Sequence, residues 1–245
     1  MEEKKIILPK QAIFFPIILG LSILLSTVVG SYVFYKVRSF SNAISVTGSA
    51  NKLVTSDKVK WISTITRNAH LSALQTGYAQ MDKDLAEVKS FLSGKGIKSE
   101  ELAISPVFMD QIYDQNNSGD REYTLRQTFT INSENVSAIT ELSKNTQALI
   151  QKGVIFSTQS LEYYYSKLSE ARVALMANAV KDARARAESL AESVGKKIGD
   201  LKSASSGVVQ VLPPNSLEIS DYGTYDTSTV DKQIMLTVRA SFTLN

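Results

Sequence analysis

The chain has 245 residues and a formal net charge of +3, and it contains one histidine and no cysteine. Five of its 27 basic and two of its 24 acidic residues lie before residue 42, so 22 of each remain in the rest of the chain. This neutral balance argues against nucleic acid as a partner, and the lack of cysteine excludes disulfides and zinc–thiolate sites.

An uncharged run of 24 residues extends from Ala12 to Tyr35. As a helix it spans about 36 Å, more than the roughly 30 Å hydrocarbon core of a bilayer, so we predict a transmembrane anchor over residues 12–35. A cleaved secretory signal is the alternative, with Ser41-Asn42-Ala43 as a weak cleavage site. The bulky residues 32–36 and the length of the run favour the anchor over both this signal and a buried core helix.

Basic residues flank the run on both sides. Lys4, Lys5 and Lys10 precede it together with the N-terminal amine, and Lys36 and Arg38 follow it. The positive-inside rule therefore predicts a cytoplasmic N-terminus. The expected organisation is a cytoplasmic tail (1–11), the anchor (12–35), a linker (36–42) and one extracytoplasmic or periplasmic domain (43–245).

The first elements of this domain show two different periods. Apolar residues alternate with polar ones at Ile44–Val46 and Val59–Ile65, which predicts two strands. From Leu71 to Leu92 they recur at steps of three and four, which predicts a helix ended by Gly94 and Gly96. The three heptads also allow a coiled coil, but the closely flanking strands favour a helix laid across a sheet.

A hairpin and a shorter helix come next. The segment Tyr123–Ile131 alternates cleanly, and a turn is expected near Asn116–Asp120. A helix capped by Ser133 or Asn135 should then run to Gly153.

The longest helix and strand close the chain. An apolar stripe rich in alanine runs from Leu168 to Ile198, and the segment Ile234–Leu244 alternates over eleven residues. The polar loop 213–231 between them is long enough to be mobile or functional. We predict an α+β fold, a two-layer sandwich with helices packed on one face of a mixed or antiparallel sheet, preceded by a single transmembrane helix.

Residues suited to chemistry are sparse. His70 lies where a strand turns into a helix, without an acidic neighbour in sequence, and is interpreted as a surface or capping residue. Asp110, Asp114 and Asp120 cluster near the hairpin tip but lack the spacing of an EF-hand calcium loop. Nucleophile-elbow, zinc-protease, Walker and dinucleotide motifs are absent. We therefore expect no enzyme activity, no metal and no cofactor.

Three consecutive tyrosines form a candidate subunit interface. Alternation places Tyr163 and Tyr165 on one face with Leu161, and Tyr164 on the other with Phe156. The simplest interpretation is a core face and a partly exposed face, and an interface is the alternative because tyrosine is enriched in such contacts. With two loop tyrosines added, the candidate interface residues are Tyr163, Tyr164, Tyr165, Tyr222 and Tyr225.

Several short motifs occur in a characteristic order. Residues 44–48 form a short strand that ends in Gly48, and an extended segment then leads to Asp57. Residues 96–102 follow the pattern G-I-x-x-x-x-L, and Tyr123–Ile131 is a strand that begins with tyrosine. A pattern of small residues in the last helix contains Ala179, Ala183, Arg186, Ala187, Leu190, Ala191, Gly195, Ile198 and Gly199.

Together these segments resemble the SIMPL domain family, found in bacterial envelope proteins and some eukaryotic signalling proteins. The resemblance covers roughly residues 44–244 and brings no catalytic residues. It implies an extracytoplasmic protein that is often oligomeric, sometimes ring-forming, and loosely linked to envelope integrity or oxidative stress. The long anchor and the loop 213–231 depart from the common form and favour a membrane-tethered assembly.

Three functional hypotheses follow. The first is a non-enzymatic, membrane-anchored protein that self-assembles as a homo-oligomeric scaffold. The second is an envelope ligand-binding or sensing module in which the loop 213–231 closes over a small molecule as a lid. The third is a hydrolase that uses the loop acids Asp221, Asp226 and Asp231.

Overall fold

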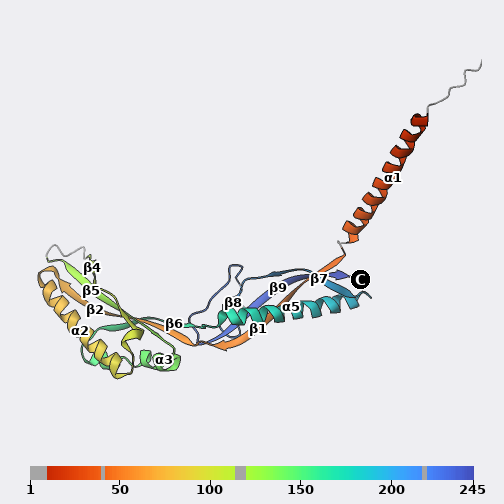
Figure 1. The fold of residues 1–245 in the computed structure, drawn as a ribbon. Helices are drawn as coiled ribbons and strands as arrows, with labels where there is room; N and C mark the ends of the chain where they lie inside the picture. The colour runs from red at the N-terminus through yellow and green to blue at the C-terminus, as the bar shows by residue number, and fades with distance from the viewer. Residues whose placement is uncertain (1–9, 40–41, 114–119, 217–219) are drawn as a thin grey trace, which may run out of the picture. The chain divides into compact units, whose positions relative to one another are not determined.

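The protein folds as α+β, with helices and two antiparallel sheets, as its sequence predicts (Figure 1). A computed structural model describes residues 10–39, 42–113, 120–216 and 220–245. The chain forms two compact units. The first contains the chain up to Ser49 together with Ala179–Ser206 and Val238–Asn245. The second contains Ala50–Asn178 and Gly207–Thr237.

Helix α1 (Lys10–Ser39) contains the predicted anchor. Its segment Phe14–Val37 is 24 residues long, strongly apolar and free of buried side chains, so it is long and apolar enough to cross a membrane. The helix continues past the predicted end at Tyr35 and takes in part of the predicted linker. Pro16 lies inside it, which membrane helices tolerate.

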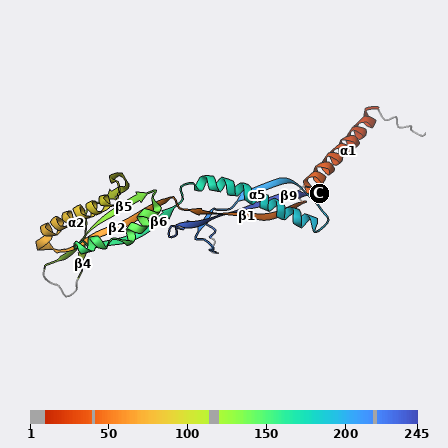
Figure 2. The same cartoon turned by 90° about the horizontal axis from the view of Figure 1, so that it is seen from below.

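The first sheet has the order β1-β9-β7, with β8 paired to β9. Its strands are β1 (Ala43–Thr55), β7 (Ile198–Ser206), β8 (Gln210–Leu212) and β9 (Asp231–Leu244). Helix α5 (Leu168–Glu192) carries the buried alanines Ala183 and Ala187, which in the first unit pack with Val46, Ala240 and Phe242. Figures 1 and 2 both show α5 running along β1 and β9.

Gly48 makes the approach of this helix possible. A β-carbon at this position would overlap the carbonyl oxygen of Ala179 and the backbone nitrogen of Ala183. Glycine is therefore required here, and the alanines of the facing helix, which carry only a methyl group, allow the two backbones to come close.

The second sheet has the order β3-β5-β2-β6, with β4 paired to β5, and its pairings are antiparallel. Its strands are β2 (Lys58–His70), β3 (Leu102–Ile104), β4 (Phe108–Ile112), β5 (Glu122–Ser133) and β6 (Phe156–Tyr164). The helical segments of this unit are η1 (Leu71–Ala73), α2 (Leu74–Gly94), η2 (Ser99–Glu101), α3 (Val136–Lys144) and α4 (Gln147–Gln151).

The core of the second unit lies between its sheet and its helices (Figure 2). Trp61, Ile65 and Phe129 from the sheet are fully buried against α2, which contributes Met81 and Val88. The opposite face of this sheet carries the polar residues of the same strands, in agreement with the predicted alternation.

Three details of the elements differ from the sequence prediction. The helix expected to run to Gly153 is broken at Asn145 into α3 and α4. The last helix ends at Glu192, short of the expected end of its apolar stripe at Ile198, while Gly195 in the following turn has a φ of 70°, the left-handed conformation that suits a glycine at a helix end. The sheet expected as one is two, because β1 pairs with β9 while β2 pairs with β5 and β6.

The predicted placement of Phe156 opposite Tyr163 is wrong. Ile62 pairs with Ser160, but Ser63 pairs with Thr158, so Gln159 forms a bulge in β6. One extra residue reverses the alternation beyond it, and Phe156 and Tyr163 therefore point into the same core.

Candidate functional site

The five candidate tyrosines occupy three different environments. Tyr163 is buried in the core, where its hydroxyl lies 3.0 Å from Thr140 Oγ1. Tyr164 and Tyr225 stack with ring centroids 6.0 Å apart, and the backbone N–H of Tyr165 donates to the Tyr225 hydroxyl at 2.9 Å. The side chain of Tyr222 is 97% exposed. The structure thus joins Tyr164, Tyr165 and Tyr225, and excludes Tyr163 from any surface.

Tyr164 is held in its neutral form. Its hydroxyl donates to Glu162 Oε2 at 2.6 Å. This hydrogen bond, together with burial and the negative charge of Glu162, raises the pKa of Tyr164 to about 12. The same bond is the main reason that the pKa of Glu162 is lowered. The ring of Tyr164 therefore presents an uncharged aromatic wall.

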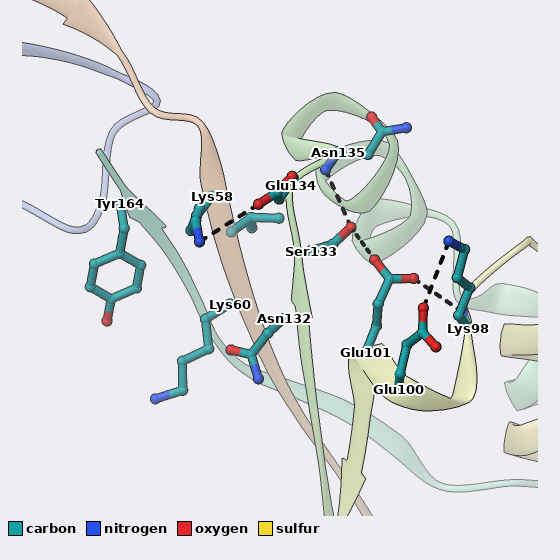
Figure 3. A pocket seen from close by; sticks show the side chains of 11 residues that line it. Lys58, Lys60, Lys98, Glu100, Glu101, Asn132, Ser133, Glu134, Asn135 and Tyr164 are labelled. Carbon is teal, nitrogen blue, oxygen red and sulfur yellow. Dashed lines mark hydrogen bonds and ion pairs between the residues drawn. The ribbon is translucent and has the colours of Figure 1, made fainter. Parts of the chain in front are cut away.

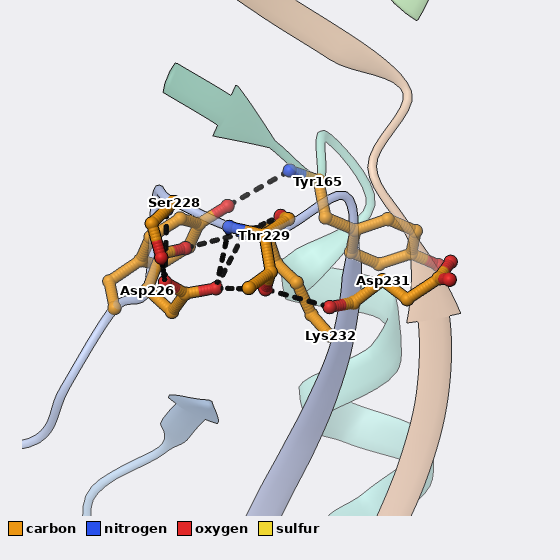
Figure 4. A network of polar contacts seen from close by, with 7 residues as sticks. Tyr165, Asp226, Ser228, Thr229, Asp231 and Lys232 are labelled. Atoms are coloured by element: carbon orange, nitrogen blue, oxygen red, sulfur yellow. Dashed lines mark hydrogen bonds and ion pairs between the residues drawn. The ribbon is translucent and has the colours of Figure 1, made fainter. Parts of the chain in front are cut away.

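The end of the loop 213–231 is fixed by a network around Asp226 (Figure 4). Asp226 Oδ1 accepts from the backbone N–H of Ser228 at 2.9 Å and from its hydroxyl at 2.6 Å. Asp226 Oδ2 accepts from the backbone and hydroxyl of Thr229 and from Lys232 Nζ, the last at 3.2 Å. Burial alone would raise the pKa of Asp226, but these donors outweigh it and lower the pKa.

The ammonium group of Lys232 completes this network from within. It is fully buried and also donates to the carbonyl oxygens of Asp226 at 2.6 Å and Thr229 at 2.7 Å. Burial lowers the pKa of Lys232, while Asp226 acts in the opposite direction. Both oxygens of the Asp226 carboxylate already accept hydrogen bonds, and the Lys232 amine has no access to solvent. The pair therefore holds the loop and is poorly placed for proton transfer.

A pocket of about 590 Å³, lined mainly by charged and polar residues, lies beside Tyr164 in the second unit (Figure 3). It is named here the β2–η2 pocket, after two of the elements that form it. Its lining residues are Lys58, Val59, Lys60, Lys98, Glu100, Glu101, Asn132, Ser133, Glu134, Asn135 and Tyr164.

One wall of the β2–η2 pocket is locked in place by Glu101. Its carboxylate accepts from Ser133 Oγ at 2.6 Å and from the backbone N–H of Lys98 at 3.1 Å. These two bonds lower the pKa of Glu101, the bond from Ser133 most of all. They also join η2 to the end of β5.

The other charges of the pocket are only loosely paired. Lys58 lies 3.6 Å from Glu134, and Lys98 lies 3.7 Å from Glu100. Lys60 lies 3.6 Å from Glu162 Oε2, the oxygen to which Tyr164 also donates. These separations exceed the usual length of a charged hydrogen bond, so water or a ligand can compete for the groups.

Sequence reasoning missed this pocket. The local signal is the spacing of Lys58 and Lys60, which places two ammonium groups on one face of a strand. The residues that meet them come from positions 98–101 and 132–135, and pairing of β2 with β5 is what brings these segments together.

The other candidate residues lie outside the Asp226 network and the β2–η2 pocket. His70 is exposed, and Asp120 accepts from the backbone and hydroxyl of Ser72. Asp110 pairs with Arg126 at 2.9 Å, and Asp114 lies outside the described residues. In the described part of the chain, no group of three or more histidines or acids is arranged to hold a metal ion.

A comparison with protein families gives a match over residues 44–243 to SIMPL, described as a protein of unknown function (DUF541). The chain belongs to the SIMPL family. No curated protein matches it.

The SIMPL motifs of this chain stabilise the fold. Gly48 and Ala183 allow the contact between β1 and α5. Asp57 accepts from the backbone N–H of Ser166 at 2.8 Å and from its hydroxyl at 2.6 Å, so it ties the turn before β2 to the segment before α5. Burial would raise the pKa of Asp57, but these two bonds dominate and lower it.

Proposed function

We propose that this SIMPL protein is a non-enzymatic, membrane-anchored envelope protein whose extracytoplasmic domain self-assembles into a homo-oligomeric scaffold linked to envelope integrity or stress. The apolar helix α1 supports the anchor, and the basic residues before it support a cytoplasmic N-terminus.

The observation that carries self-assembly is a set of tyrosines, named here the tyrosine surface, made of Tyr164, Tyr165, Tyr222 and Tyr225. Tyr222 is almost fully exposed, three residues before Tyr225, which is held by Tyr164 and Tyr165. Asp226 and Lys232 then fix the chain directly behind Tyr225. Tyr222 and Tyr225 are exposed, whereas Tyr164 and Tyr165 are half-buried. An exposed aromatic side chain next to a fixed segment loses little entropy on association, which favours an interface.

A single-cysteine experiment tests this interface, because the natural chain has no cysteine. Tyr222→Cys in the full-length protein should give covalent dimers with a short bis-maleimide crosslinker in native membranes. Tyr113→Cys is the matched control, since Tyr113 is also highly exposed, at 86%. Equal and low crosslinking of the two variants would remove the tyrosine surface from the proposal.

Ligand binding is the second candidate, and the β2–η2 pocket favours it. Among the described residues of the loop 213–231, none lines this pocket, and the network of Asp226 restrains the loop at its end. These observations favour ligand binding in the pocket over the hypothesis that the loop closes it as a lid. A ligand present at 100 times its dissociation constant should stabilise the protein by about 2.7 kcal/mol, which thermal unfolding across a ligand library detects.

A further inference from the structure

We propose that the β2–η2 pocket binds a short peptide in its zwitterionic form, with the peptide carboxylate at Lys58 and Lys60 and the peptide ammonium at Glu100. This inference concerns a small ligand and does not depend on self-assembly. It rests on the second candidate function, ligand binding, and names a ligand class for the β2–η2 pocket. No described residue of the loop 213–231 lines this pocket, although Tyr164 in its wall stacks on Tyr225 of that loop.

The first observation is the arrangement of charges in the pocket. Three lysines and three glutamates line it, so it has no net charge. Figure 3 shows Lys58 and Lys60 with Glu134 on one side, and Glu100 and Glu101 with Lys98 on the other, so the two walls carry opposite net charges. A ligand with charge of one sign would meet repulsion from one of the two walls. A ligand with opposite charges at its two ends matches both walls.

The groups that remain available give the ligand its direction. Glu101 is already held by Ser133 and the backbone of Lys98. Glu100, whose side chain is 77% exposed and only loosely paired with Lys98 Nζ at 3.7 Å, is then the acceptor on that wall. On the opposite wall, the loose pairs of Lys58 and Lys60 leave ammonium donors for a carboxylate.

The centre of the pocket fits a peptide group. Asn132 lies opposite Lys60 in the pairing of β2 and β5, and Figure 3 shows its side chain between the two charged walls. Its amide makes no hydrogen bond with any residue of the described chain, and it offers one acceptor and two donors. A peptide N–H and C=O between the charged ends of the ligand would satisfy it.

The remaining lining suits small side chains of a peptide. Tyr164 supplies an uncharged ring, and the aliphatic stems of the lysines add apolar surface. The volume of about 590 Å³ lies within the range of small-molecule sites. Because Ser133 and Glu101 already lock one wall, little ordering is required on binding.

Calorimetric titration of the full-length protein in mild detergent with trialanine tests the proposal. Trialanine should bind, while N-acetyl-trialanine and trialanine amide, each lacking one charge, should bind at least about tenfold more weakly. Failure of trialanine to bind at about 10 mM, or equal binding of the blocked peptides, would overturn the proposal.

Two variants assign the ends of the peptide. Lys58→Gln keeps much of the stem and should weaken trialanine about tenfold while leaving trialanine amide unchanged. Glu100→Gln should weaken trialanine and leave N-acetyl-trialanine unchanged. Lys152→Gln is the matched control, because Lys152 is as exposed as Lys58, at 54% against 53%, and lies outside the pocket.

Circular dichroism and thermal unfolding establish that each variant is folded, as expected for substitutions of exposed side chains. If Lys58→Gln and Glu100→Gln bind all three peptides as Lys152→Gln does, the proposed contacts are wrong.

Discussion

At the scale of single residues, the buried charge of Lys232 shows how the loop before β9 is held. Its ammonium group donates to Asp226 and to two backbone carbonyl groups, and no part of the residue is exposed. A buried charge costs several kcal/mol of desolvation unless its partners are complete. The network therefore depends on every one of its members.

Replacing Lys232 by methionine should destabilise the protein by about 3 kcal/mol, because it leaves the Asp226 carboxylate buried without its cation. Denaturant unfolding of the variant and the natural chain measures this difference. Lys89→Met, at an exposed position of helix α2, is the control and should change stability by less than about 0.5 kcal/mol. A similarly small loss for Lys232→Met would contradict the role assigned to the network.

Asp226 also predicts a dependence of stability on pH. Its folded pKa lies below the ordinary value of about 3.9, so ionised Asp226 stabilises the fold above that pH, and this contribution declines as the pH falls toward the folded pKa. The stability deficit of Asp226→Asn relative to the natural chain should thus be constant from pH 7 to about 5 and shrink below about pH 4. Denaturant unfolding at each pH gives this deficit, and a deficit that grows on acidification would contradict the assignment.

At the scale of elements, the strands were the easiest to predict, because each has one buried face. The alternation from Ile234 to Leu244 corresponds to β9, and that from Tyr123 to Ile131 lies within β5. The bulge at Gln159 could not be predicted, since it arises from pairing with β2 and leaves no local mark in the sequence. The break between α3 and α4 does have a local mark, because Asn145 and Thr146 interrupt the apolar pattern between Leu142 and Leu149.

The contact between β1 and α5 gives a prediction at this scale. Gly48→Ala should destabilise the protein by about 2 kcal/mol or more, because the new methyl group has to displace the backbone of α5. Gly94→Ala is the control, since a β-carbon there meets no atom within 4 Å and Gly94 is the last residue of α2. Thermal unfolding compares the two, and equal midpoints would show that β1 and α5 pack less closely than described.

At the scale of the whole molecule, membership of the SIMPL family could be predicted because its motifs are spread along the chain. The division into two sheets could not, since a strand's alternation shows that one face is buried but not which strand lies beside it. The β2–η2 pocket was missed for the same reason. Lys58, Glu100 and Asn132 meet only after β2 and β5 pair. Of the tyrosines named as interface candidates, Tyr164, Tyr165 and Tyr225 come together while Tyr163 belongs to the core, and the interface itself stays a prediction.

Self-assembly predicts that the loop tyrosine contributes to the oligomer. Tyr222→Ala should lower the mass of the assembly or shift it toward single chains at low protein concentration. An aromatic anchor at an interface can contribute about 2 kcal/mol or more to association, which corresponds to about one or two orders of magnitude in affinity. Tyr113→Ala should leave the mass unchanged. Sedimentation velocity over a dilution series distinguishes the two variants, and identical behaviour would place the interface elsewhere.

The measurement that tests the central claim most directly is the mass of the full-length protein, solubilised in mild detergent, by light scattering with the detergent contribution subtracted. The account predicts one discrete species whose protein mass is two or more whole multiples of the 26.9 kDa chain. A monodisperse species of one chain, at the concentration found in native membranes, would contradict self-assembly.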